Sequence, residues 1–223
     1  MGITPSIEKP KVLASMQTWP LEKIQGIIRK FLDEEYQFGL HPSDVETLFG
    51  LEPEDAEELM LSLSRNKKTS AVVNAVVILA AMVLIAEPNT ASLETRKKTL
   101  FSIMDFNGMG QISQDELEIL LFCVSAASAC ITNRKSEIPK SSRVKELTVR
   151  AAEKLKKDKK TKITYEEYSY WSKEIVTENR ADLQDIVTYM DKARFESLPN
   201  YIAANSYEPE PEAVAEVVES QPE

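Results

Sequence analysis

Apolar residues recur every three to four positions in several stretches of the chain, which is the spacing of a helix with one buried face. Four such stretches have the apolar positions Leu21, Ile24, Ile27, Ile28 and Phe31; Leu93, Leu100, Phe101 and Met104; Leu117, Leu120, Leu121 and Val124; and Leu183, Ile186, Val187, Met190 and Phe195. Only six of the 223 residues are glycine, which argues against a turn-rich β fold. The pattern predicts an all-α protein.

One further stretch is apolar without periodicity. Residues 71–86 contain no charged side chain and one strongly polar residue, Asn74. The stretch is shorter than the ~20 residues needed to cross a bilayer, and no basic flank follows it. We therefore expect a helix that is buried on all sides at the centre of the fold, where it forms part of the floor of a groove. A membrane segment is the alternative.

Residues 105–116 read Asp-Phe-Asn-Gly-Met-Gly-Gln-Ile-Ser-Gln-Asp-Glu and match the twelve-residue calcium loop of an EF-hand. Hard cations such as Ca²⁺ prefer six to eight oxygen donors. The donors that the loop offers are Asp105 at position one, Asn107 at three, the Gln111 carbonyl at seven, Ser113 at nine through a water, and Glu116 at twelve as a bidentate carboxylate. The sequence predicts one calcium site here, with Mg²⁺ as a second candidate ion.

Position five of this loop departs from the pattern. It is Met109, whose thioether does not coordinate a hard cation, so the position contributes at most its backbone carbonyl. Gly110 at position six fits the pattern, because a residue without a Cβ enters the positive-φ turn at little cost. Ile112 at position eight can pair with a second loop in a short β-bridge. We expect weaker binding than a complete loop would give.

A second segment, 156–167, keeps the outline of such a loop without its ligands. Ile163 falls at position eight and Glu167 at position twelve, but lysines occupy positions one and five. Ammonium groups where carboxylates should converge repel a divalent ion. This loop is not expected to bind calcium.

Two N-terminal segments are more degraded. Segment 33–44 has Leu40 at position eight, but Phe38 stands where the loop requires glycine. Segment 65–76 keeps only Val72 at position eight, followed by an apolar helix. Neither segment is expected to hold a metal ion.

The four loops therefore start at residues 33, 65, 105 and 156, with the longest linker between the third and the fourth. Over residues 20–178 this arrangement resembles the neuronal calcium sensor, calcineurin B-like and calaxin-like group of EF-hand proteins. The resemblance implies two pairs of EF-hands in one compact array, apolar grooves that receive a partner helix, and regulatory binding in place of catalysis. We expect five divisions of the chain: an N-terminal arm (1–19), a degenerate pair (20–88), a pair with one near-complete loop (89–178), a C-terminal helix (179–198) and an acidic tail (199–223).

Charge is distributed unevenly along the chain. Of the net −9, residues 195–223 hold −7, because they carry seven glutamates and no lysine or arginine, so the preceding 194 residues hold −2. Such a tail is expected to be disordered or extended along another surface. Residues 154–162 carry six lysines, which suit either a solvated loop or a contact with an acidic partner, anionic lipid or the tail. No aromatic residues alternate with these lysines, which argues against nucleic-acid binding.

Few residues suggest other chemistry. Cys123 and Cys130 lie seven residues apart, on one face of a helix, and are expected to be buried free thiols, since no secretion signal is evident. The single histidine, His41, precedes a proline in a predicted loop. No phosphate-binding loop and no nucleophile with a histidine base can be found, so the chain is not expected to be an enzyme.

The sequence begins Met1-Gly2-Ile3-Thr4-Pro5-Ser6, which fits the myristoylation pattern with Gly2 as the acceptor. One acyl chain without a basic neighbour anchors only marginally, so membrane contact is expected only if Gly2 is acylated. Otherwise we expect a cytoplasmic protein, either free or attached to cytoskeletal or axonemal structures.

Two functions fit these features. The first is a calcium-responsive regulator that binds an amphipathic helix or a cytoskeletal or motor component. The second is a calcium-independent structural adaptor of a cytoskeletal or ciliary assembly. The predicted C-terminal helix either folds back into the groove or extends the surface for the partner.

Overall fold

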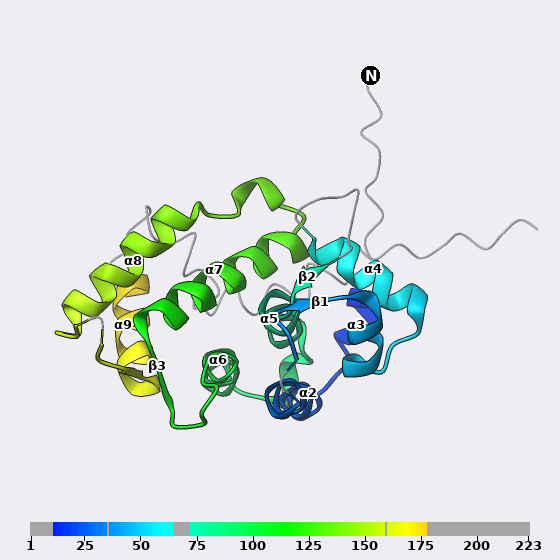
Figure 1. Cartoon of the computed structure of the whole chain (residues 1–223), viewed down its shortest axis with the longest axis horizontal. Coiled ribbons are helices and arrows are strands. Elements are labelled where there is room, and N and C mark those ends of the chain that lie inside the picture. The colour runs from blue at the N-terminus through cyan, green and yellow to red at the C-terminus, as the bar shows by residue number, and fades with distance from the viewer. Residues whose placement is uncertain (1–10, 35, 65–71, 159, 178–223) are drawn as a thin grey trace, which may run out of the picture.

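A computed structural model describes residues 11–34, 36–64, 72–158 and 160–177. The described part is mostly helical, which confirms the expected all-α class at this coarse level (Figure 1). The N-terminal half contains α1 (Lys11–Met16), α2 (Leu21–Asp33), β1 (Gly39–Leu40), α3 (Pro42–Phe49), α4 (Pro53–Leu63), β2 (Val73–Asn74) and α5 (Ala75–Ile85). The C-terminal half contains η1 (Pro88–Thr90), α6 (Leu93–Ser102), β3 (Gln111–Ile112), α7 (Gln114–Ile131), η2 (Lys135–Glu137), α8 (Ser141–Lys154), β4 (Ile163–Thr164) and α9 (Tyr165–Thr177).

Helix α5 forms the centre of the core. All of its residues from Ala75 to Ile85 are buried, and it packs against α7, α2, α6, α4 and α1. Asn74 does not interrupt the helix but caps it, because its Oδ1 accepts the Val76 N–H at 2.8 Å. The expected burial on all sides is confirmed for residues 75–86. Among the described residues, no helix combines the length and hydrophobicity needed to cross a membrane.

Helices α5 and α7 bring the two halves of the chain into one continuous apolar core (Figure 1). Arg96 of α6 reinforces this junction, although it is 2% exposed. Its guanidinium donates to the carbonyls of Val83 at 3.3 Å and Ala86 at 2.9 Å and also contacts the carbonyl of Glu87. The Val83 carbonyl lies in the last turn of α5 and the other two just beyond its end. The buried arginine therefore supplies donors where the helix itself supplies none.

Four short strands join the connections between helices in pairs. Gly39 and Leu40 of β1 pair antiparallel with Asn74 and Val73 of β2, and β3 pairs in the same way with β4. Val73, and not Val72 at position eight of segment 65–76, lies opposite Leu40. Val73 is 6% exposed, whereas Val72 is 49% exposed. Adjacent strand residues point to opposite faces, so two consecutive valines leave this register open in the sequence.

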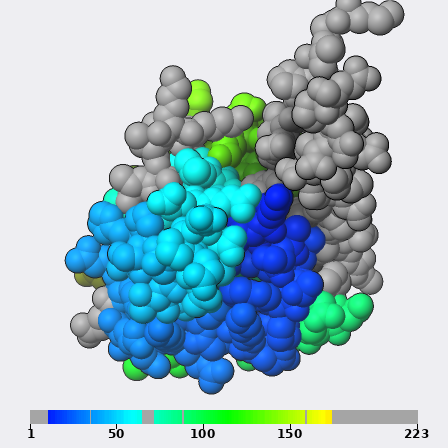
Figure 2. All heavy atoms as spheres, turned by 90° about the vertical axis from the view of Figure 1, so that its right-hand side faces the viewer, coloured from blue at the N-terminus to red at the C-terminus, as the bar shows by residue number. Residues whose placement is uncertain are grey.

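The segment expected to be an N-terminal arm contains a helix that belongs to the core. Val12, Leu13 and Met16 of α1 are buried, and α1 packs against α4. The carboxylate of Glu58 in α4 accepts the N–H groups of Lys11 at 2.8 Å and Val12 at 3.2 Å, which satisfies two donors at the start of α1. Figure 2 shows the dark blue α1 against the cyan surface to which α4 contributes. Gly2, the predicted helix at 179–198 and the acidic tail lie outside the described residues.

Candidate metal centre

The loop after α6 is organised around Asp105. Its Oδ2 accepts the N–H of Gly110 at 2.7 Å, and its Oδ1 accepts the N–H of Met109 at 3.1 Å. The amide oxygen of Asn107 accepts the same Met109 N–H at 3.0 Å. Gly108 and Gly110 adopt φ values of 64° and 70°, a region that favours glycine. The loop therefore turns tightly around two of the predicted oxygen donors.

The end of the loop is fixed by reciprocal capping of α7. Ser113 Oγ accepts the Glu116 N–H at 3.2 Å, and Glu116 Oε2 accepts the Ser113 N–H at 2.5 Å. This capping box satisfies two donors at the start of the helix and holds the predicted twelfth ligand next to the ninth. Ser-X-X-Glu before an apolar run is a sequence signal for this arrangement.

A second loop, 156–167, lies alongside the first. Ile112 pairs with Ile163 and Gln111 with Thr164, and both isoleucines are buried. The N–H of Tyr165 donates to the Gly110 carbonyl at 3.3 Å and extends this contact. The strand pair therefore joins the two loops through the residues that the sequence placed at position eight.

A lysine from the second loop reaches the first. Lys162 Nζ lies 3.1 Å from Glu116 Oε2, the oxygen that also accepts the Ser113 N–H. Burial alone raises the pKa of Glu116, but the Ser113 hydrogen bonds and the Lys162 ammonium outweigh it and hold this pKa below its usual value. Glu116 is thus stabilised as a carboxylate, the form that binds a metal.

Loop 156–167 is held by its own side chains. Asp158 Oδ1 accepts the N–H groups of Lys160 at 2.9 Å and Thr161 at 2.8 Å. Lys157 Nζ lies 2.7 Å from Glu167 Oε1, while Glu167 Oε2 accepts the Thr164 N–H at 3.0 Å. An ammonium therefore contacts the carboxylate at position twelve of this loop as well.

The donors of loop 105–116 suit a hard cation but supply little charge. Asp105, Asn107, Ser113, Glu116 and the Gln111 carbonyl all offer oxygen, the atom that Ca²⁺ and Mg²⁺ prefer. The side chain of Met109 is 72% exposed, so position five supplies no side-chain ligand. Among the described residues, no group of three or more histidine, cysteine, aspartate or glutamate side chains is placed to hold a metal. Any ion here would rely on two carboxylates and neutral oxygens.

The N-terminal segment 33–44 contacts the candidate loop through aromatic rings. Phe38 meets Phe106, the second residue of the loop, edge to face at 5.6 Å between ring centroids, and also meets Phe31 at 6.3 Å. Both Phe38 and Phe106 are almost half exposed. Segment 33–44 therefore provides an aromatic contact where a calcium loop would have a glycine turn.

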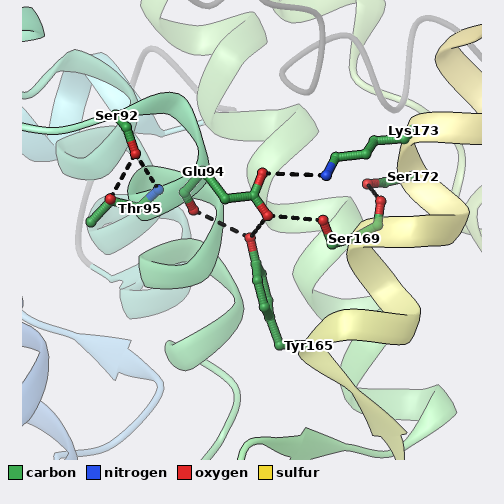
Figure 3. Close-up of polar contacts among 7 residues, drawn as sticks. All are labelled: Ser92, Glu94, Thr95, Tyr165, Ser169, Ser172 and Lys173. Atoms are coloured by element: carbon green, nitrogen blue, oxygen red, sulfur yellow. Dashed lines mark hydrogen bonds and ion pairs between the residues drawn. The ribbon is translucent and has the colours of Figure 1, made fainter.

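Sequence reasoning missed a polar cluster that ties α6 to α9 (Figure 3). Glu94 Oε1 accepts the hydroxyls of Tyr165 at 2.9 Å and Ser169 at 3.0 Å, and its Oε2 lies 3.7 Å from Lys173 Nζ. Burial raises the pKa of Glu94, but the two hydroxyls and the nearby lysines lower it by a larger amount. The pKa of Glu94 therefore lies below its usual value. The partners are more than 70 residues apart in sequence, and no local pattern connects them.

The two cysteines lie in helix α7, and the histidine lies outside the helices. Cys123 and Cys130 are free and buried, as predicted. His41 is exposed immediately before α3.

No protein-family model matches the chain, and no curated protein shows significant sequence similarity to it.

Proposed function

We propose that this chain is an EF-hand protein that binds one divalent cation, preferentially Ca²⁺, in loop 105–116 and acts by binding a protein partner. One observation carries the proposal. Asp105 gathers the N–H groups of Met109 and Gly110 into a glycine turn, and the next residues pair with a second loop at Ile112 and Ile163. Two loops joined at position eight, each leading into a helix, suit the paired EF-hand arrangement.

The proposed role is binding to a helix or to a component of a cytoskeletal or motor assembly. Phe106 lies inside the candidate loop and contacts Phe38 of the N-terminal half, and both rings are partly exposed. A conformational change in loop 105–116 would therefore alter the exposed apolar surface formed by these two rings, which a partner can contact. Catalysis forms no part of the proposal.

A specific observation favours the calcium-independent adaptor as the second candidate. The carboxylates at position twelve of both loops already have ammonium partners, Lys162 for Glu116 and Lys157 for Glu167. Asp158 also orders its loop through hydrogen bonds to backbone and hydroxyl groups of the same loop. Loops held in this way do not require an ion to keep their shape.

Calorimetric titration with Ca²⁺ tests the proposal. The wild-type chain should release or absorb heat with a stoichiometry of one, and Glu116→Gln should lose this signal because the bidentate carboxylate is gone. Asp115→Asn is the matched control, since it removes one negative charge at the adjacent position without removing a predicted ligand. Absence of heat in the wild type at millimolar Ca²⁺ would refute the calcium role. Partner capture in the presence of chelator, unchanged in Glu116→Gln, would favour the adaptor.

A further inference from the structure

The position of Lys162 is set by the strand pairing. Ile163 lies opposite Ile112, so in this antiparallel register Lys162 comes opposite Ser113, which caps the helix that bears Glu116. Its ammonium lies 3.1 Å from Glu116 Oε2, and the two side chains are 42% and 26% exposed. The β-bridge that joins the two loops therefore also places Lys162 next to Glu116, the candidate metal ligand.

A divalent ion and this ammonium require the same carboxylate. The glutamate at position twelve closes the coordination sphere with both of its oxygens. In the structure Oε2 of Glu116 is shared by the Ser113 N–H and the Lys162 ammonium. Because a cation bound to both oxygens would lie against a second positive charge, Lys162 has to leave Glu116 before the ion is fully coordinated.

Loop 156–167 contains a second ion pair of this kind, with a shorter distance between the charged groups. Lys157 contacts Glu167 at 2.7 Å, and the Lys157 side chain is only 19% exposed. Both ammonium groups come from loop 156–167, so this one loop supplies a cation to each carboxylate at position twelve. The repeated pairing indicates a role for these lysines that a merely solvated basic loop would not have.

We propose that Lys162 is an intramolecular cation that competes with the divalent ion for Glu116 and thereby sets the affinity of loop 105–116. This inference rests on the proposed function. Without bound ion, Lys162 neutralises Glu116 and keeps the end of the loop in place. Ion binding displaces the ammonium into solvent, which its partly exposed position permits. Affinity is therefore set by a residue of the partner loop in addition to the ligands themselves.

Two variants of equal charge change test the competition by calorimetric titration with Ca²⁺. Lys162→Met removes the ammonium but keeps an aliphatic side chain, and the dissociation constant should fall about twofold to fivefold, the range expected for a partly exposed ion pair. Lys160→Met is the control. This lysine lies in the same loop, but its ammonium forms no ion pair with a carboxylate among the described residues. The substitution should change the dissociation constant less than about twofold through screened charge alone.

A second measurement follows Lys162 in the wild-type chain. Amine acetylation, quantified by mass spectrometry with and without saturating Ca²⁺, should be faster at Lys162 when calcium is bound and unchanged at Lys160. This readout needs no substitution, so a poorly folded variant cannot affect it.

The outcomes separate this inference from the function on which it rests. If the wild type binds Ca²⁺ but Lys162→Met and Lys160→Met have equal affinities, or if Lys162 acetylation does not respond to Ca²⁺, the competition is refuted while the calcium role stands. If neither the wild type nor Lys162→Met binds at millimolar Ca²⁺, both are refuted. Heat in Lys162→Met alone would support the competition but refute the calcium role of the wild-type chain.

Discussion

Glu94 offers the sharpest test of how the helices around the candidate site are held together. Its carboxylate accepts two hydroxyl hydrogen bonds, from Tyr165 and Ser169, and both donors are less than 10% exposed. Hydrogen bonds to a charged group contribute roughly 1.5–3 kcal/mol each. The Glu94 side chain is 51% exposed, so solvent screens its charge and each bond contributes about 1 kcal/mol, as an ordinary hydrogen bond does. We expect Glu94→Ala to destabilise the protein by about 2 kcal/mol, or a melting temperature about 4–8 °C lower for a chain of this size.

Helix α4 provides the matched control. Glu54 occupies the second position of α4, as Glu94 does in α6, so both interact equally with the helix dipole. Glu54 is exposed and makes no hydrogen bond or ion pair within the described residues. Glu54→Ala should cost no more than about 1 kcal/mol. Equal melting temperatures for the two variants, by thermal denaturation followed by circular dichroism, would refute the tertiary role of Glu94.

The contribution of Glu94 to the free energy of unfolding should depend on pH with a definite sign. The pKa of Glu94 in the folded protein lies below its ordinary value of 4.5, so its contribution to stability is fully present above that pH. The contribution is lost as the pH falls through the lower, folded pKa. The difference in unfolding free energy between wild type and Glu94→Gln should therefore be constant near neutral pH and shrink below about pH 4.5. A difference that grew on acidification would contradict the assignment.

Two further predictions concern backbone conformation and thiol burial. A methyl group added at Gly110 or Gly26 meets no atom within 4 Å, but Gly110 has φ of 70° whereas Gly26 lies inside α2. Gly110→Ala should therefore destabilise by about 1–2 kcal/mol and Gly26→Ala should stabilise by about 0.5–1 kcal/mol, as measured by urea denaturation; shifts of the same sign would contradict these conformations. Burial raises the pKa of Cys123 to about 12, so this thiol should resist alkylation at pH 8 in the native protein and react in urea. Rapid native labelling would contradict its burial.

The candidate loop itself could be predicted because its information is local. Asp105, Gly110, Ser113 and Glu116 lie within one dozen residues, and each has a conformational or hydrogen-bonding reason to be where it is. The central helix could also be predicted. Residues 75–85 are apolar on every face of the helix, so none of its faces is suited to contact with water. Both inferences depend on residue type and spacing alone.

What could not be predicted depends on contacts between distant segments. The contact of Lys162 with Glu116 spans 46 residues, and its existence follows from the β-bridge register. The pairing of Val73 in place of Val72 with Leu40 has the same origin, since the two residues are chemically identical and only the core distinguishes them. The sequence indicates only that Phe38 replaces the glycine of a calcium loop, and the structure adds that its ring contacts Phe106 between the two halves.

These contacts also determine how far ion binding could change the conformation of loop 105–116. Asp105 and Asn107 already accept backbone N–H groups, and Glu116 already has Ser113 and Lys162, so an ion would enter a loop that is ordered beforehand. A ligand shifts a conformational equilibrium only through unequal affinity for the two states. The proposed regulation of partner binding therefore requires that release of Lys162 alters the contact of loops 105–116 and 156–167, and with it the Phe106–Phe38 pair. If that contact survives the release, the proposed ion is a structural stabiliser and the result favours the adaptor over the calcium-responsive regulator.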